Sequence, residues 1–183
     1  MIRKAILISL LILMIPLSCK AITLDEQIKI KQEAETLCTN FKDVCSVKFP
    51  MSHIPQGYTT YQGDIILTTG LINYLSYDEV RAVVLHEVGH RVLKHYQKQD
   101  KFLQKWNLSQ KELQIFRHSN EFEADLFATK YYKLLSQKNY LPQALTKLTA
   151  PDKMDLSTTT HPSTNSRIER IKIYNRYSCF KFN

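Results

Sequence analysis

The sequence predicts an α+β fold that is mainly helical and carries a small β-sheet. Three capping boxes of the type Ser/Thr-x-x-Glu begin at Thr23, Ser76 and Ser109, and each precedes a long segment of helical composition. Only two short segments, 45–50 and 63–70, combine β-branched residues with flanking proline or glycine in the way of strands. The chain has 183 residues and no linker-like segment, which favours a single domain.

The first 21 residues have the features of an export signal. Arg3 and Lys4 precede an apolar segment, residues 5–17, which is shorter than the roughly 20 residues that span a bilayer. We therefore expect one domain over residues 22–183, in a protein exported to the periplasm or cell envelope.

The sequence allows three ways in which this signal segment is processed. Cleavage after Ala21 would release a soluble protein, whereas a lipoprotein signal would be cut before Cys19 and leave a lipidated anchor. An uncleaved N-terminal anchor is the third alternative. The last two predict association with a membrane.

Net charge gives little reason to expect a nucleic-acid partner. Loss of Arg3, Lys4 and Lys20 with the signal lowers the formal net charge from +8 to +5. No run of basic residues is interleaved with aromatic ones, so a solvated basic surface explains the charge better than binding to nucleic acid.

The four cysteines permit a disulfide, because export leads to an oxidising compartment. Cys38 and Cys45 are the natural pair and would close a short loop. If Cys19 is lost or lipidated, Cys179 is either a free thiol or changes this pairing. No Cys-x-x-Cys spacing indicates a thiolate metal site.

The long helices follow from the capping boxes in chain order. The first covers about residues 24–41, the second begins after Ser76 and continues to about Gln99, and the third follows Ser109. We expect the second and third to pack together. A last helix from about Asn165 presents an apolar face at Ile168, Ile171 and Tyr174.

The second helix contains the sequence HEVGH at residues 86–90. His86 and His90 are four residues apart, so both imidazoles lie on one face of the helix and can bind one metal ion. Glu87 can then flank the open metal position as a general base for water. Chance predicts only about 0.01 such motifs in a chain of this composition, and a metal-free buried helix would leave these polar groups without partners.

The third ligand must come from another element. On a continuous helix His95 would be rotated about 140° from His90 and would point elsewhere. Glu121 and Asp125 are four apart on the next long helix: Glu121 can complete a His, His, Glu set, and Asp125 can fix the tautomer of a ligating histidine. Glu123, between them, should point away. Taken alone, this segment would be interpreted as a solvated acidic helix face.

These motifs together resemble a known family. HEVGH, the histidine at His95, EFEAD at 121–125, the segment GDIILTTGLINYL before the zinc helix and HPSTNSRI near the end are similar, in this order, to zinc metallopeptidases of the HExxH gluzincin type. The family contains HtpX, the CAAX prenyl endopeptidase and BepA. The resemblance covers about residues 55–175 and implies a zincin-like metallopeptidase domain with one zinc ion per chain.

The resemblance implies a role for each matching residue. His86, His90 and Glu121 would hold the zinc, and Glu87 would activate the water. The remaining matches are Asp125 and Arg167, which would support the ligands, and His161, which would approach the metal from a late loop. His161 would either stabilise the oxyanion or cap the zinc and hold the enzyme inactive.

The expected function is that of a zinc-dependent endopeptidase acting on protein substrates, unfolded or misassembled envelope proteins in particular. We expect the active-site helix to lie under an edge strand from about Gly63 to Thr68, which would pair with an extended peptide. The chain shows neither the further membrane spans of HtpX nor the repeat domain of BepA, so it resembles a minimal exported member. Two alternatives are a zinc-bound but proteolytically inactive chaperone or binding module capped by His161, and a disulfide-held structural domain without metal.

Overall fold

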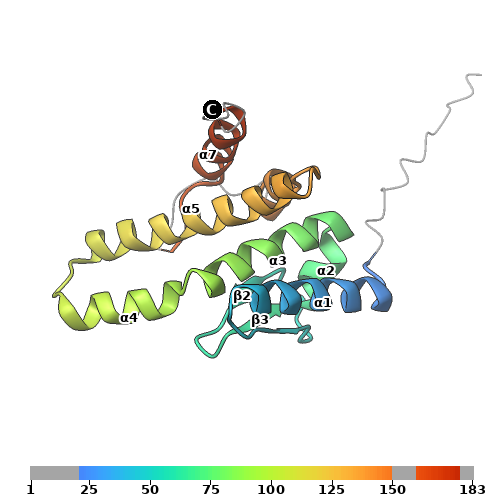
Figure 1. Ribbon diagram of the computed structural model, residues 1–183, viewed down its shortest axis with the longest axis horizontal. Coiled ribbons are helices and arrows are strands. Elements are labelled where there is room, and N and C mark those ends of the chain that lie inside the picture. Colours follow the sequence, from blue (N-terminus) through green and yellow to red (C-terminus); the bar gives the residue numbers. More distant parts are fainter. Residues whose placement is uncertain (1–20, 150–159, 178–183) are drawn as a thin grey trace, which may run out of the picture.

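The computed structural model describes residues 21–149 and 160–177 (Figure 1). The mainly helical α+β class is confirmed, with seven helices and one three-stranded sheet in these residues. The predicted signal, Cys19 and Cys179 lie outside them, so the domain boundary at residue 21 stays a prediction. The elements in chain order are α1 (Leu24–Asn40), β1 (Ser46–Lys48), β2 (Gly57–Thr59), β3 (Asp64–Leu67), α2 (Thr69–Tyr74), α3 (Tyr77–Val92), α4 (His95–Lys105), α5 (Gln110–Leu134), α6 (Leu141–Leu148) and α7 (Thr164–Tyr177).

Helix α3 lies in the middle of the molecule (Figure 1). It packs against α1 and β2 on one side and against α5 and α6 on the other, while α7 lies on α5 and α6. Nearly every residue of α3 from Glu79 to Gly89 is therefore buried, polar ones included. This position explains why the segment has no clear polar face in the sequence.

The three long helices begin where their capping boxes predict. The backbone N–H of Thr23, Ser76 and Ser109 each donates to the glutamate three residues later, at 2.7, 2.8 and 2.8 Å. Each box satisfies an amide at the open end of a helix, which is why this local pattern is a dependable start signal.

The sheet has the strand order β1-β3-β2, and this corrects the predicted edge. Strand β3 pairs in parallel with β1 and antiparallel with β2, so the segment expected to be the edge is the central strand. The edge beside α3 is β2, which has three residues and gave no sequence signal. A tight turn joins β2 to β3, with Gly63 at a φ of 96° that favours glycine.

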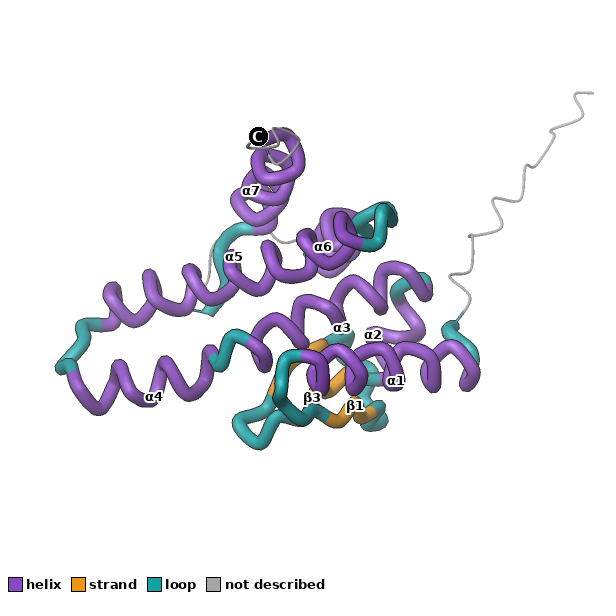
Figure 2. The backbone as a smooth tube through the Cα atoms, in the orientation of Figure 1, coloured by secondary structure: helices purple, strands orange, loops and turns teal. Residues whose placement is uncertain are grey.

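The predicted helix from Ser76 to Gln99 is also corrected, because it is broken after Val92. Helix α3 ends at Val92, Lys94 adopts the left-handed conformation with φ 57° and ψ 42°, and α4 begins at His95 (Figure 2). Left-handed backbone cannot continue an α-helix, so the chain changes direction here. No glycine or proline marks the break.

A disulfide joins Cys38, near the end of α1, to Cys45, just before β1. Both residues are buried and belong to the main hydrophobic core, which extends from α1 and the sheet to the helices on the other side of α3. Within the described residues, no helix combines the length and the apolar character needed to span a membrane.

Candidate metal centre

Close contact between α3 and α5 brings the two motif-bearing helices together. Gly89 faces Ala124 and Phe127 on α5, and a Cβ atom at Gly89 would lie only 3.1 Å from the Cα of Ala124. The glycine inside HEVGH therefore allows the helices to approach more closely than a larger residue would. This approach sets the face with His86 and His90 against the face with Glu121 and Asp125.

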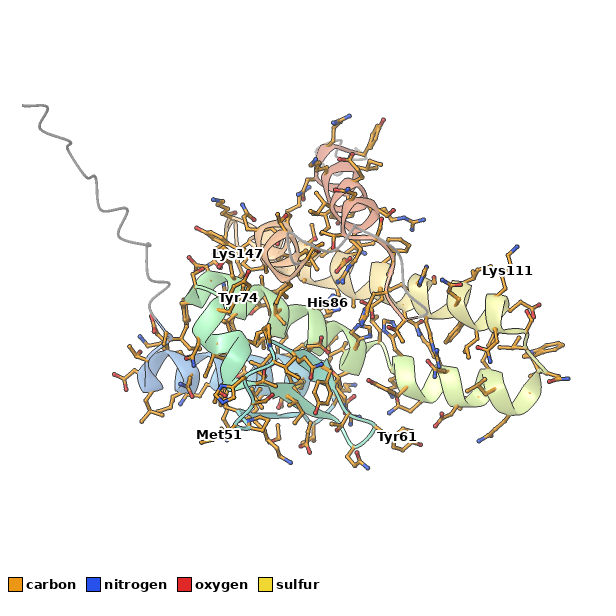
Figure 3. The ribbon with its side chains drawn as sticks, turned by 180° about the vertical axis from the view of Figure 1, so that it is seen from behind. Met51, Tyr61, Tyr74, His86, Lys111 and Lys147 are labelled. Atoms are coloured by element: carbon orange, nitrogen blue, oxygen red, sulfur yellow. A yellow bond between two sulfur atoms is a disulfide. The ribbon has the colours of Figure 1, made fainter. Side chains whose placement is uncertain are left out.

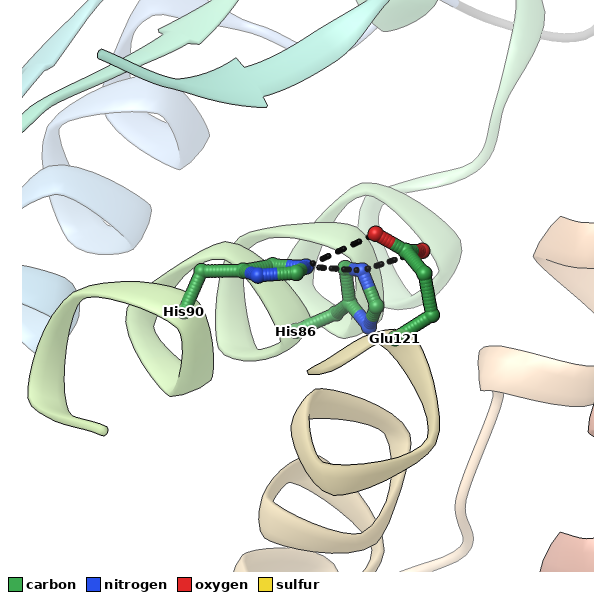
Figure 4. Close-up of side chains that lie close together, drawn as sticks. All are labelled: His86, His90 and Glu121. Carbon is green, nitrogen blue, oxygen red and sulfur yellow. Dashed lines mark hydrogen bonds and ion pairs between the residues drawn. The ribbon is translucent and has the colours of Figure 1, made fainter. Parts of the chain in front are cut away.

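The structure brings His86, His90 and Glu121 into one cluster (Figure 4). The Nε2 atoms of the two histidines are 3.1 Å apart. Oε1 of Glu121 lies 3.2 Å from Nε2 of His90, and Oε2 lies 3.5 Å from Nε2 of His86. His86 and Glu121 are buried, and only 12% of the His90 side chain is exposed.

This cluster fits a tetrahedral zinc site. Two ligand atoms, each about 2.0–2.1 Å from a tetrahedral zinc ion, are about 3.3 Å apart, and the three separations above lie close to that value. Among the described residues, no well-aligned hydrogen bond reaches the buried Oε2 of Glu121, although Nδ1 of His161 lies 2.9 Å from it. A buried carboxylate that faces several imidazole nitrogens is a donor set that a cation would satisfy. The residues therefore fit one zinc ion.

Asp125 and Arg167 lie directly behind His86. Oδ1 of Asp125 is 2.9 Å from Nδ1 of His86, and Arg167 donates to both oxygens of Asp125 at 2.6 and 2.8 Å. Nη2 of Arg167 also lies 3.3 Å from Nδ1 of His86, a longer contact than its bond to Asp125. A proton on Nδ1, held by Asp125, leaves the Nε2 lone pair free for a metal.

Burial and the neighbouring polar groups shift the pKa values of His86, Asp125 and Glu121 in opposite directions. Burial disfavours the charged form of His86, but hydrogen bonds to Asp125 and Glu121 outweigh it and raise the pKa of His86 to about 9. Burial likewise opposes ionisation of Asp125 and Glu121. Arg167 nevertheless lowers the pKa of Asp125 to about 2, and the neighbouring histidines hold the pKa of Glu121 well below its usual range. Both carboxyl groups are therefore ionised at neutral pH.

Glu87 is oriented by Thr59 of the edge strand β2. The Thr59 hydroxyl lies 2.9 Å from Oε2 of Glu87 and 3.0 Å from its backbone carbonyl oxygen, and both residues are buried. Tyr96 of α4 donates a short hydrogen bond to the backbone oxygen of Thr59. These contacts tie the strand, the zinc helix and α4 together around one carboxylate.

A cavity of about 320 Å³ opens beside the cluster. His161 lies at its mouth, more than half exposed, with Nδ1 2.9 Å from Oε2 of Glu121. Figure 3 shows His86 deep between the long helices, whereas Tyr61 projects from the turn after β2. The cavity is lined by Gly57, Tyr58 and Thr59 of β2, Glu87 and His90 of α3, His95, Tyr96 and Gln99 of α4, Arg117, Asn120 and Glu121 of α5, and Thr160 and His161.

His95 is outside the metal-binding group, as expected, but it lies beside His90 and is not rotated away from it. Nδ1 of His95 lies 2.9 Å from Nδ1 of His90, and Nε2 of His95 lies 3.3 Å from Oε2 of Glu123. The break at Lys94 is the reason, because it removes the rotation that a continuous helix would impose between His90 and His95. Glu123, expected to point away, lies beside His95 with about half of its side chain exposed.

Every residue expected at the site lies in or beside this cluster. Sequence reasoning missed Thr59, Tyr96 and the contact of His95. The histidine five residues after HEVGH was a usable signal for the last of these. The three-residue strand carrying Thr59 gave none, because strands this short have no readable alternation.

Comparison with known protein families gives one match. The model of Peptidase family M48 matches residues 46–111 and 98–175, a region that contains β1 to α6 and most of α7. A comparison with curated proteins finds no match.

Proposed function

The chain belongs to peptidase family M48 and is a zinc metalloendopeptidase, and we propose that it cleaves unfolded or misassembled proteins of the cell envelope. One observation supports this most: the buried His86, His90 and Glu121 cluster shares a cavity with Glu87 and with the edge strand β2. A metal site, a base and a strand edge able to bind a peptide are thus adjacent.

We assign the zinc ligands to Nε2 of His86, Nε2 of His90 and the carboxylate of Glu121. A zinc ion bound there would polarise the scissile carbonyl and lower the pKa of water at its open position. Asp125 holds the tautomer of His86 that such binding requires, and Arg167 holds Asp125. These two residues act through the ligands and do not touch the substrate.

Glu87 is the proposed general base. The Thr59 hydroxyl donates a hydrogen bond to Oε2 of Glu87. The other oxygen, Oε1, is therefore the one proposed to take a proton from the attacking water. The same carboxyl group then donates this proton to the departing amine. Because Thr59 holds the carboxylate before substrate arrives, little reorganisation is needed during the reaction.

The edge strand β2 is the proposed substrate-binding strand, in place of the segment 63–68. An extended peptide added to an edge strand forms backbone hydrogen bonds, which depend little on the substrate's side chains. Such binding requires a locally unfolded substrate, because a folded protein rarely offers an unpaired extended segment. This supports unfolded or misassembled proteins as the substrate class.

An envelope location is part of the proposal. The apolar segment 5–17 after Arg3 and Lys4 supports export, and the Cys38–Cys45 disulfide fits an oxidising compartment. Whether the exported chain is soluble, lipidated at Cys19 or anchored by its N-terminal segment decides how it meets substrates near a membrane. Mass spectrometry of the N-terminus of the purified, natively expressed protein would distinguish these forms.

His161 supports a second candidate function, because it contacts the ligand Glu121 at the mouth of the cavity. In the main proposal the imidazole stabilises the oxyanion, so His161→Ala lowers casein cleavage by about 10–100-fold while zinc is retained. If His161 instead caps the site of a proteolytically inactive binding module, the same substitution raises cleavage. An increase would thus favour the alternative.

The proposed chemistry is tested by Glu87→Gln in the full-length protein. We expect zinc content to stay at the wild-type value and casein cleavage to fall by about 10²–10⁴-fold, because the amide cannot accept the proton. Glu169→Gln, an exposed position on α7, is the matched control and should cleave as wild type does. Equal cleavage by Glu87→Gln and wild type would refute the assignment of the base.

A further inference from the structure

The imidazole of His95 is buried and engaged at both nitrogens. Only 3% of its side chain is exposed, although α4 is otherwise a largely exposed helix. Nδ1 of His95 is 2.9 Å from Nδ1 of His90, and the two rings meet edge to face. Nε2 of His95 is 3.3 Å from Oε2 of Glu123 on α5. His95 thus lies between a zinc ligand and a carboxylate.

The direction of these hydrogen bonds follows from the proposed zinc site. Nε2 of His90 faces Nε2 of His86 and Oε1 of Glu121, so a metal bound there takes the Nε2 lone pair. The neutral ring of His90 must then carry its proton on Nδ1. This proton points at Nδ1 of His95, which can accept it only when the proton of His95 is on Nε2.

Glu123 provides the acceptor that this tautomer of His95 needs. A carboxylate accepts hydrogen bonds and donates none, so the contact at 3.3 Å requires a proton on Nε2 of His95. The two contacts of His95 therefore require the same tautomer. We propose that His90, His95 and Glu123 form a relay in which His95 positions the second zinc ligand, as Asp125 positions the first; the inference rests on the proposed zinc site.

The backbone supports a positioning role for His95. A lysine in the left-handed conformation is unfavourable, yet Lys94 adopts it immediately before His95. A continuous helix would turn His95 about 140° away from His90 and break the relay. The break at Lys94 thus places an acceptor, Nδ1 of His95, beside Nδ1 of His90. No other described residue approaches Nδ1 of His90 as closely.

The test measures zinc affinity of the full-length protein by competition with a chromophoric chelator. His95→Leu retains apolar bulk but removes the acceptor, and we expect its zinc dissociation constant to rise by about 10–100-fold. His95→Asn can present an oxygen near the position of Nδ1, and its affinity should stay within about threefold of wild type. His53→Leu, at an exposed position, is the matched control.

A merely structural role of His95 predicts a different pattern. It would lower the melting temperature of the metal-free protein in His95→Leu and leave the zinc affinity of the folded fraction unchanged, and this result would overturn the relay. The wild-type protein gives a second readout that does not depend on folding of a variant. Nitrogen-15 spectra of its zinc-loaded histidine rings should show the proton on Nδ1 of His90 and on Nε2 of His95.

The outcomes separate this inference from the proposed function. The relay would be refuted if wild type binds zinc tightly and His95→Leu binds it equally well. It would also be refuted if the spectra show the opposite tautomer of His95. Either result would leave the proposed metallopeptidase function standing. Absence of zinc from folded wild type would overturn both. Weakened binding in His95→Leu together with recovery in His95→Asn would support the relay.

Discussion

Arg167 on α7 and Asp125 on α5 form a buried two-point ion pair, with donor–acceptor distances of 2.6 and 2.8 Å. The pair lies against His86 and fixes the C-terminal helix to the zinc helix, although these residues are far apart in the sequence. Because both partners are buried, removing one leaves the charge of the other without compensation.

Arg167→Ala should therefore destabilise both the fold and the metal site. We expect the free energy of unfolding of the metal-free protein to fall by about 3–5 kcal/mol, measured by urea denaturation. Lys172→Ala removes an exposed pair with Glu169 on the same helix and should change stability by less than about 1 kcal/mol. Equal stability of Arg167→Ala and Lys172→Ala would contradict the account.

Gly89 gives a second prediction, which concerns the contact between α3 and α5. Gly→Ala inside a helix ordinarily stabilises it by about 0.5–1 kcal/mol. Here the added Cβ would lie 3.1 Å from the Cα of Ala124, so we expect Gly89→Ala to destabilise instead and Gly89→Val to do so by about 1–3 kcal/mol. Zinc affinity should be highest in wild type, lower in Gly89→Ala and lowest in Gly89→Val. If thermal melting shows Gly89→Ala to be more stable than wild type, the contact between α3 and α5 does not restrict the size of the residue at position 89.

Glu79 gives a prediction for pH dependence. Burial raises the pKa of its carboxyl group, but hydrogen bonds from Lys147 and Ser76 outweigh burial and lower the pKa below 4.5. A carboxyl group with a lowered folded-state pKa stabilises the protein above its unfolded pKa, and this contribution is lost as the pH falls through the folded pKa.

Glu79→Gln isolates this charge, because glutamine retains the capping geometry. The variant should be less stable than wild type at pH 7, and the difference should shrink as the pH is lowered below about 4.5. Denaturation of both proteins across this pH range provides the measurement. A stability difference that is the same at pH 7 and in acid would show that the charge of Glu79 contributes nothing.

The sequence predicts where the three capped helices begin and which residues form the metal cluster, because both depend on local spacing. A capping box is complete within four residues, and two histidines four apart share a helix face in any fold. Glu121 also depends on helical spacing, together with the expectation that two long helices pack. The predicted pairing of Cys38 with Cys45 agrees with the structure because so short a loop leaves the two thiols close.

The errors concern features that tertiary structure decides. Strand β2 has three residues and forms only because β3 provides a partner, so neither the edge nor the role of Thr59 was predictable. The kink at Lys94 runs against the preference of lysine and is stabilised by contacts such as the one between His90 and His95. Its consequence, the position of His95, was missed for the same reason.

The zinc content of the purified full-length protein tests the central claim most directly. Elemental analysis of wild type beside Glu121→Ala, with casein cleavage measured on the same samples and Glu169→Ala as the matched control, separates the ligand from a surface glutamate. We predict about one zinc ion per chain in wild type and in Glu169→Ala, and loss of both zinc and cleavage in Glu121→Ala. A folded wild-type protein without zinc, or undiminished zinc in Glu121→Ala, would contradict the account.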